Sequence, residues 1–356
     1  MTLFYLCPST NTPFGGVRVI YRHVDLLNKA GIPATVLHAS RDFRCNWFEN
    51  STRVASLPVE ITDADVLVVP ETMNRLLTSL APGVPKVSFI QNAFLALQGP
   101  GPLEDHPYLI AEDLLVCTAV SEQNLRLLEY AFPGKRFQRI HVSIDPAVFH
   151  LPERRPDKRI VYMPRKRSND FRMVVNILRS RGALWGWDIV ALDHLPQSVV
   201  SRTLRSASLF LSFSEHEGCP LPPLEALASG CSVIGYTGFG AREYFEPPDA
   251  IAVPEGDVLS FAREVENWLH NFNADDHWLT APRRSERALA AYSQEQEAVD
   301  VVSFWRNALS NLPEPRGTTY TIKPSDVVVK RSWRTLWGQS FTYLRGGAQK
   351  LAGRGA

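Results

Sequence analysis

The sequence predicts an α/β protein made of two doubly wound halves that face each other across a cleft. Short apolar runs alternate with stretches of helical periodicity from residue 3 onward, the pattern of buried parallel strands joined by helices. A segment rich in proline and charge interrupts the alternation at residues 145–156, after which it restarts. Glycine- and proline-rich loops follow several of the apolar runs, and in open α/β sheets ligands bind where such loops leave the strands.

Composition agrees with a globular protein of two domains. The 356 residues are 45% hydrophobic, which allows each half to bury a core of its own. The formal net charge of +1 gives no overall bias toward nucleic acid. The five cysteines are odd in number and none has C-x-x-C spacing, so we expect reduced thiols rather than disulfides or a zinc site. Because there is no signal-peptide pattern and no apolar run of about 18 residues, the expected location is the cytoplasm.

The N-terminal half opens as a Rossmann-type unit of strand, loop, helix and strand. The strands are predicted at residues 3–6 and 34–37, and four apolar residues between them recur at helical spacing: Val17, Ile20, Val24 and Leu27. The loop ends in Gly15 and Gly16, which let the backbone approach a ligand closely, although an ordinary strand-to-helix turn would also use glycine. The loop lacks the G-x-G-x-x-G pattern, so the sequence does not favour an NAD site.

Further strands of this half are predicted at residues 66–69, 87–90, 114–120 and 140–144. Gln91 and Asn92 follow the strand at 87–90, and Ser121 is a predicted helix cap. Asp63 and Asp65 form a D-x-D pair, but they precede a strand and therefore lie at the edge opposite the ligand loops. We expect no metal site there.

The second half restarts with a strand at 159–163, followed by Pro164-Arg165-Lys166-Arg167. Three cations at the carboxyl end of that strand would face the cleft, where they are suited to hold a diphosphate. A solvated basic turn is the alternative interpretation. Residues 193–196 follow the next strand, residues 235–240 are a predicted glycine-rich loop, and residues 284–309 are predicted as one long helix.

The most informative stretch, Ser212–Ile234, reads as a strand, a polar and proline-rich loop, a helix and a strand. Glu217 lies in the predicted loop, and Glu225 follows in the first turn of a helix that starts near Pro222. A helix N-terminus suits a phosphate, and a neighbouring carboxylate can accept hydrogen bonds from sugar hydroxyls. The alternative interpretation is that Glu225 only caps the helix and that Glu217 is an exposed loop residue.

This stretch resembles the E-x7-E signature of the family-4, GT-B-type retaining glycosyltransferases, written E-G-F-G-L-P-x-L-E-A-M-A-x-G. The residues here are EGCPLPPLEALASG, from Glu217 to Gly230, and Pro220 departs from the pattern by removing one backbone N–H from the loop. The resemblance implies a GT-B fold with two Rossmann-like domains, at 1–150 on the acceptor side and 151–310 on the donor side. It implies transfer of a sugar from a nucleotide-diphosphate donor to a glycan or lipid-linked acceptor, with retention of configuration.

By the same resemblance, the donor-binding residues would be Arg165, Lys166, Gly218, Leu221, Pro222 and Glu225. Glu217 would be catalytic, and Gln91 and Asn92 stand near the position where the family often has a histidine. Gly15 and Gly16 would border the acceptor and phosphates, residues 193–196 would contact the nucleobase, and neither metal nor cofactor is expected. An epimerase or phosphorylase of the same fold, or a non-catalytic binding subunit, remains open as an alternative.

Residues 311–356 are predicted as a basic tail. From Tyr320 onward it contains seven Lys or Arg and one acidic residue, a net charge of +6, which leaves −5 for the preceding residues against the total of +1. Aromatic and basic residues alternate over 330–345 as in an amphipathic helix, which suits a membrane surface. Packing on the N-terminal domain, a second subunit and disorder are the alternatives, and the sequence leaves the oligomeric state open.

Overall fold

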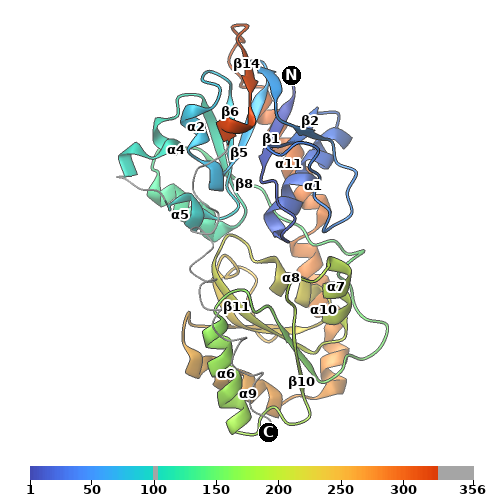
Figure 1. Ribbon diagram of the computed structural model, residues 1–356. Helices are drawn as coiled ribbons and strands as arrows, with labels where there is room; N and C mark the ends of the chain where they lie inside the picture. The colour runs from blue at the N-terminus through green and yellow to red at the C-terminus, as the bar shows by residue number, and fades with distance from the viewer. Residues whose placement is uncertain (99–102, 328–356) are drawn as a thin grey trace, which may run out of the picture.

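The computed structural model describes residues 1–98 and 103–327. Figure 1 shows two lobes, with the N-terminal lobe in blue and cyan above the C-terminal lobe in green and yellow. Within the described residues, a parallel sheet of seven strands lies in the upper lobe and a parallel sheet of five strands in the lower lobe. Two doubly wound α/β halves are therefore confirmed.

The N-terminal sheet has the order β3-β2-β1-β5-β6-β7-β8. Its strands are Leu3–Cys7 (β1), Ala34–His38 (β2), Val54–Ser56 (β3), Val66–Pro70 (β5), Lys86–Phe89 (β6), Leu114–Ala119 (β7) and Phe137–Arg139 (β8). Its helices are Gly15–Lys29 (α1), Leu76–Ser79 (α2), Ala93–Ala96 (α3), Pro107–Ile110 (α4) and Glu122–Ala131 (α5), with 3-10 turns at Glu71–Met73 (η1) and Leu103–Asp105 (η2).

The C-terminal sheet has the order β10-β9-β11-β12-β13. Its strands are Arg159–Tyr162 (β9), Asp188–Ala191 (β10), Leu209–Glu217 (β11), Ser232–Phe239 (β12) and Ala250–Val253 (β13). Its helices are Ser168–Ser180 (α6), Gln197–Arg205 (α7), Leu221–Ala228 (α8), Val258–His270 (α9) and Ala274–Ala291 (α10).

In each sheet the strand order reverses beside the first strand of the lobe. β1 lies between β2 and β5, and β9 lies between β10 and β11. The loops that leave such neighbouring strands diverge and open a crevice at the carboxyl end of the sheet. Gly15 follows β1, Arg165 follows β9, and Glu217 is the last residue of β11. The topology therefore brings these predicted ligand-binding residues to the two crevices.

The strand predicted at 140–144 is absent from the described structure. Ile140, Val142 and Ile144 are buried, and their alternation with more exposed neighbours produced the period of two that predicted a strand. This segment instead leaves the sheet edge after β8 and crosses toward the last helices, where the Ile144 N–H donates to the Tyr292 carbonyl. The edge strand is β8, which pairs with β7.

Strands β11 and β12 run further than predicted. β11 reaches Glu217 because it continues after a bulge between Ser214 and Glu217, and Glu217 pairs in register with Phe239. Glu217 therefore stands at a strand end rather than in a loop. Gly235 and Gly238, predicted in a loop, lie within β12.

The long helix predicted at 284–309 is two helices. α10 ends at Ala291, and Ser293 caps a new helix, Gln294–Leu309 (α11), by accepting from the Gln296 N–H. After this break, α11 lies in the N-terminal lobe beside α1 (Figure 1). There the Trp305 indole donates to the Tyr5 hydroxyl at 2.7 Å, with both side chains buried.

After α11 the chain stays on the N-terminal lobe. Thr319–Ile322 (β14) pairs antiparallel with Val59–Thr62 (β4), and Pro324–Val327 (α12) follows. The D-x-D carboxylates serve this attachment and the strand beside it: Asp63 accepts from the Arg316 N–H at 2.8 Å, and Asp65 accepts from the Thr2 N–H at 2.7 Å. The predicted membrane stretch at 330–345 lies outside the described residues.

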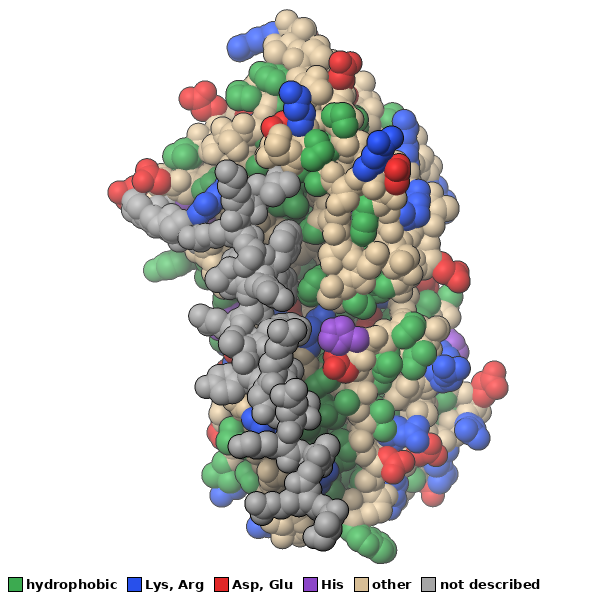
Figure 2. All heavy atoms as spheres, in the orientation of Figure 1, with side chains coloured by type: hydrophobic (Ala, Val, Ile, Leu, Met, Phe, Trp, Pro, Cys, Tyr) green, Lys and Arg blue, Asp and Glu red, His purple; other side chains and the backbone are tan. Residues whose placement is uncertain are grey.

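Positive and negative side chains are interspersed over the face shown in Figure 2, in keeping with the near-neutral net charge. Among the helices in residues 1–98 and 103–327, none combines the length and the apolar character needed to cross a bilayer.

Candidate active site

A cavity of about 310 Å³ lies between the two lobes. Loops at the carboxyl ends of both sheets form its walls, as the topology requires. The structure brings the residues predicted for catalysis, for donor binding and for the glycine loop to this one cavity, namely Gly15, Gly16, Gln91, Asn92, Arg165, Lys166, Glu217, Gly218, Leu221, Pro222 and Glu225. Residues as far apart in the sequence as Gly15 and Glu225 thus line the same cavity.

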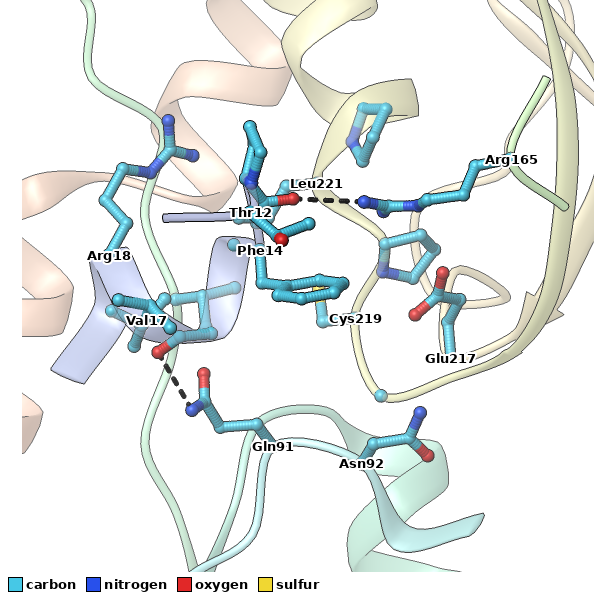
Figure 3. Close-up of a pocket in the computed structure, with 18 of the residues that line it drawn as sticks. Thr12, Phe14, Val17, Arg18, Gln91, Asn92, Arg165, Glu217, Cys219 and Leu221 are labelled. Atoms are coloured by element: carbon cyan, nitrogen blue, oxygen red, sulfur yellow. Dashed lines mark hydrogen bonds between the residues drawn. The ribbon is translucent and has the colours of Figure 1, made fainter. Parts of the chain in front are cut away.

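The glycines at the start of α1 allow two close approaches. A Cβ on Gly15 would lie 3.2 Å from Cδ1 of Leu221 in the other lobe, and a Cβ on Gly16 would lie 3.0 Å from Nε2 of Gln91. That Nε2 donates to the Gly16 carbonyl at 3.0 Å, as the dashed line in Figure 3 shows. Gln91 therefore binds the glycine loop as well as lining the cavity.

Lys166 and Glu217 form an ion pair inside the cavity. The Lys166 Nζ lies 2.5 Å from Oε1 of Glu217 and also donates to the Glu215 carbonyl at 2.9 Å. Both side chains are only about a quarter exposed, at 21% and 27%. Lys166, which was predicted to bind the diphosphate, and Glu217, which was predicted to bind the sugar, are thus in direct contact with each other.

Arg165 crosses from the C-terminal lobe toward the N-terminal one. Its Nη1 donates to the Pro13 carbonyl at 3.0 Å, and its guanidinium lies 5.5 Å from the centre of the Phe14 ring (Figure 3). A guanidinium over an aromatic face is attracted to the ring electrons. Arg165 therefore approaches the loop that precedes α1.

Arg167 does not join the other two cations in the cavity wall. Its backbone is left-handed, with φ of 46°, and its guanidinium turns to Asp170 and Glu255 at 3.4 and 3.2 Å and stacks over Tyr236. The prediction of three cations facing the cleft is wrong for this residue. The reversal of the chain at Arg167, just before α6, directs its side chain into its own lobe.

Helix α8 starts at Leu221, so Glu225 lies beyond its first turn, contrary to the prediction. Pro220, Pro222 and Pro223 have no N–H, which leaves Leu221 as the backbone donor among the four positions 220–223 whose N–H groups a helix start leaves without an intrahelical partner. A phosphate at this position would therefore depend more on the neighbouring cations than on backbone donors.

Arg18 is the important residue that sequence reasoning missed. It extends from α1 across the cleft, and its Nη2 lies 2.9 Å from Oε1 of Glu225. Glu225 is nearly buried, with 8% of its side chain exposed, and Arg18 is 22% exposed. The available signal was a cation three residues after Gly15, in the first turn of the predicted helix, but nothing local identified its partner 207 residues away.

At the far side of the cavity, the wall is formed by the segment after β10. Leu192, Asp193, His194 and Leu195 line it, so three of the four residues predicted near the nucleobase lie there. Asp193 and His194 contact each other at 2.7 Å, and His194 has a left-handed backbone with φ of 50°.

A further carboxyl of the cavity wall, Glu71, was not predicted. It is 6% exposed, and burial raises the pKa of its carboxyl to about 7 against the opposing effect of hydrogen bonds from its own backbone and those of Gln91 and Asn92. Glu71 therefore supports the turn that carries the two predicted amides. Burial also raises the pKa of the Cys219 thiol, so this cavity residue stays protonated at neutral pH.

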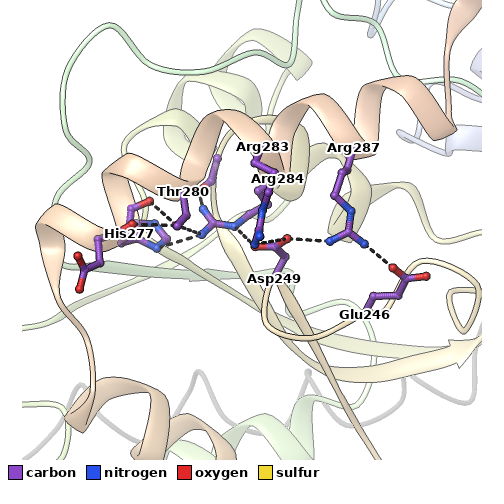
Figure 4. Close-up of polar contacts among 9 residues, drawn as sticks. Glu246, Asp249, His277, Thr280, Arg283, Arg284 and Arg287 are labelled. Carbon is purple, nitrogen blue, oxygen red and sulfur yellow. Dashed lines mark hydrogen bonds and ion pairs between the residues drawn. The ribbon is translucent and has the colours of Figure 1, made fainter.

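Helix α10 binds the C-terminal end of α8 through two side chains. The Ser285 hydroxyl donates to the Ala228 carbonyl at 2.6 Å, and Arg284 donates to the Gly230 carbonyl at 2.5 Å. Figure 4 shows that Asp249 lies among three arginines of α10, which are Arg283, Arg284 and Arg287. Arg284 and Asp249 are 4% and 7% exposed, so this buried pair ties α10 to the C-terminal sheet and holds the end of α8.

Comparison with known proteins gives one family match and one curated relative. Residues 188–284 match the family described as Glycosyl transferases group 1. The chain is 27% identical over 290 residues to an alpha-1,6-glucosyltransferase of Actinobacillus pleuropneumoniae serotype 7 (strain AP76), covering 75% of this chain and 83% of that protein.

Solved structures share the fold at low identity. A sucrose-phosphate synthase from Thermosynechococcus elongatus has a TM-score of 0.62 at 12% identity, over 87% of this chain and all of that one. The lipopolysaccharide outer core galactosyltransferase WaaB has a TM-score of 0.56 at 12% identity, over 87% and 99%. A S. aureus TarM mutant in complex with Fondaparinux, alpha-GlcNAc-glycerol and UDP has a TM-score of 0.53 at 13% identity, and this chain spans 56% of its length. The fold is GT-B, and these findings support a glycosyltransferase.

The Asp249 cluster yields a stability prediction. Asp249→Ala leaves Arg284 buried without its carboxylate, and breaking such a pair costs about 3–5 kcal/mol of unfolding free energy. Urea denaturation followed by circular dichroism measures the loss. Arg126→Ala, which breaks an ion pair whose arginine is 73% exposed, is the control and should change stability by less than about 1 kcal/mol. Equal losses in the two variants would contradict a supporting role for Asp249.

Proposed function

We propose that this chain transfers a sugar from a nucleotide-diphosphate donor to a hydroxyl of a glycan or lipid-linked glycan, retains the anomeric configuration and needs no metal. The observation that carries the proposal is the contact of Lys166 with Glu217 at the carboxyl ends of two neighbouring strands, inside a cavity closed by the other lobe. The family match over residues 188–284 and the alpha-1,6-glucosyltransferase relative support it.

The diphosphate would be held by side-chain cations. Arg165 and Lys166 reach the cavity from the loop after β9, and Arg18 reaches it from α1. The three prolines leave few backbone N–H groups at the start of α8. As the bond from sugar to phosphate breaks, negative charge grows on the leaving diphosphate. Cations already held in place stabilise that charge without reorganising, which is the electrostatic route to catalysis.

Glu217 would bind the donor sugar. When a diphosphate draws Lys166 toward its oxygens, the Glu217 carboxylate loses its partner and gains free lone pairs for sugar hydroxyls. A carboxylate near the anomeric carbon also stabilises the positive charge that develops there. The ion pair seen in the structure therefore keeps both groups ordered until the donor takes its place between them.

Glu225 would accept hydrogen bonds from the ribose hydroxyls of the nucleotide. Its present partner, Arg18, is more exposed and carries several N–H donors, so it can turn toward a phosphate while Glu225 turns to the ribose. The residues at 192–195 would then border the nucleobase.

The acceptor would enter from the side of Gly15, Gly16, Gln91 and Asn92. The two amides donate and accept hydrogen bonds but do not act as bases at neutral pH. An oxygen of the leaving phosphate would therefore take the proton of the acceptor hydroxyl, on the same face from which the sugar departs. That geometry is the one that retains configuration.

The proposed function predicts a new sugar–acceptor bond as the product. The purified chain is incubated with single nucleotide sugars, beginning with glucosyl donors because of the curated relative, and with oligosaccharide or lipid-linked acceptors in the presence of a metal chelator. Mass spectrometry should show the acceptor heavier by one sugar residue and release of the nucleoside diphosphate. An isomerised donor, a sugar phosphate, or no turnover with donors that bind would contradict the proposal.

Glu217→Gln should lower kcat by about 100-fold, because the amide keeps the size of the side chain but removes the charge that stabilises the transition state. The thermal midpoint should stay close to that of wild type, because Glu217 is 27% exposed and its pair with Lys166 adds little stability. Initial rates at saturating donor measure the effect, and the exposed Glu286→Gln on α10 is the control. Turnover at the wild-type rate would remove Glu217 from the mechanism.

Glu225→Gln should weaken binding of nucleoside diphosphates by about 10-fold or more, because hydrogen bonds to a charged acceptor contribute roughly 1.5–3 kcal/mol. Isothermal titration calorimetry with several nucleoside diphosphates measures the change, and the exposed Glu129→Gln on α5 is the control. Free inorganic pyrophosphate lacks the ribose, so its binding should respond much less. Equal weakening for both ligands would place Glu225 at the phosphates instead.

A further inference from the structure

The N-terminal end of α5 carries a buried amide that contacts both walls of the cavity. Ser121 caps the helix by accepting from the Asn124 N–H at 3.3 Å, and both side chains are fully buried, with no exposed surface. A buried amide is costly unless both its donor and its acceptor are used.

Each end of the Asn124 amide reaches a different candidate catalytic turn. Its Oδ1 accepts from the Ala93 N–H at 2.6 Å, directly after Asn92. Its Nδ2 donates to the Gly218 carbonyl at 3.0 Å, directly after Glu217, and to the Ser121 hydroxyl oxygen at 3.1 Å. The Ser121 hydroxyl donates to the same Gly218 carbonyl at 2.6 Å. One side chain of the N-terminal lobe thus joins the two turns across the cleft.

The Gly218 backbone is tightly enclosed at this point. A Cβ on Gly218 would lie 1.6 Å from the Gln91 carbonyl oxygen, and a Cβ on Gly240 would lie 2.1 Å from the Gly218 carbonyl oxygen. The loop after Glu217 is therefore held between the backbone of one lobe and the backbone of the other. Its carbonyl has a defined direction, toward Ser121 and Asn124.

A separate contact holds the two lobes together beside this turn. Glu243 of the C-terminal lobe accepts from the Glu122 N–H at 3.0 Å, from Arg139 at 2.5 Å and from the Tyr292 hydroxyl at 2.6 Å. Closure of the lobes at α5 therefore does not depend on Asn124 alone. This separation makes it possible to distinguish an effect on the Glu217 loop from an effect on closure.

We propose that Asn124 is a positioning residue that sets Glu217 in its working orientation and couples it to the turn carrying Gln91 and Asn92. Glu217 reaches that orientation only when the lobes are closed, because its neighbour Gly218 belongs to the C-terminal lobe and both donors to the Gly218 carbonyl belong to the N-terminal lobe. The catalytic part of this inference rests on the proposed glycosyltransferase function, whereas the loop docking does not.

The test is Asn124→Asp, which keeps the shape and the acceptor for the Ala93 N–H but places an oxygen against the Gly218 carbonyl where an N–H₂ donated. We expect kcat to fall by about 100-fold, as for a small misplacement of a catalytic group, with little change in nucleoside diphosphate affinity by calorimetry. Hydrogen exchange followed by mass spectrometry should show faster exchange in the peptide that contains residues 214–222.

Asn28→Asp is the matched control. Asn28 likewise binds the backbone with both ends of its amide, donating to the Ala34 carbonyl at 2.9 Å and accepting from the Ala34 N–H at 3.0 Å. Ala34 is the first residue of β2, at the end of the same sheet opposite the cavity loops. Asn28→Asp should leave kcat and hydrogen exchange at residues 214–222 unchanged.

Glu243→Gln tests closure alone and should raise the KM of the donor more than it lowers kcat. If Asn124→Asp does not fold, Ser121→Ala removes the second donor to Gly218 and should give a smaller loss of the same kind.

Exchange at residues 214–222 that stays as slow as in wild type would overturn the docking role, whatever the activity. A loss of kcat matched by an equal loss of nucleotide affinity, or equal to that of Asn28→Asp, would overturn the positioning role. If wild type turns over no donor while exchange in Asn124→Asp rises as expected, the glycosyltransferase proposal fails and the docking of the loop stands.

Discussion

The close approach of the turn after β11 to the turn after β6 determines the geometry of the cavity. Gly218 lies against the Gln91 carbonyl with no room for a side chain, so the two lobes meet backbone to backbone at this point. Everything else at the cavity is arranged around that contact. Glu217 precedes it, the amides at 91 and 92 lie across from it, and α8 leaves from it with its C-terminal end bound by α10.

Two cation–carboxylate pairs lie in the cavity. Lys166 contacts Glu217, and Arg18 contacts Glu225, each at a hydrogen-bonding distance and each partly shielded from solvent. Pairing offsets part of the cost of shielding these charges from solvent and holds each side chain in a defined direction. A ligand with negative phosphates and neutral hydroxyls can replace both pairs at once, because it offers acceptors to the cations and donors to the carboxylates.

Several features followed from the sequence and others did not. The E-x7-E stretch, the glycine loop and the cations after β9 all lie at the cavity, because a loop at the carboxyl end of a strand is recognisable from the apolar run before it. The prediction of a strand at residues 140–144 was wrong, because alternate burial against helices has the same period of two as a strand in a sheet. The prediction that Arg167 faces the cavity was wrong, because its left-handed backbone reverses the direction of its side chain.

Patterns within a few neighbouring residues predicted the alternation of strands and helices in each half and the loops that carry polar chemistry. The partners of the side chains were set by the tertiary fold. Arg18 meets Glu225 across 207 positions, and Asn124 meets Gly218 across 94. Such contacts depend on how two separately folded sheets are placed against each other. That placement follows from the packing of whole surfaces, such as α11 against α1, which no local pattern encodes.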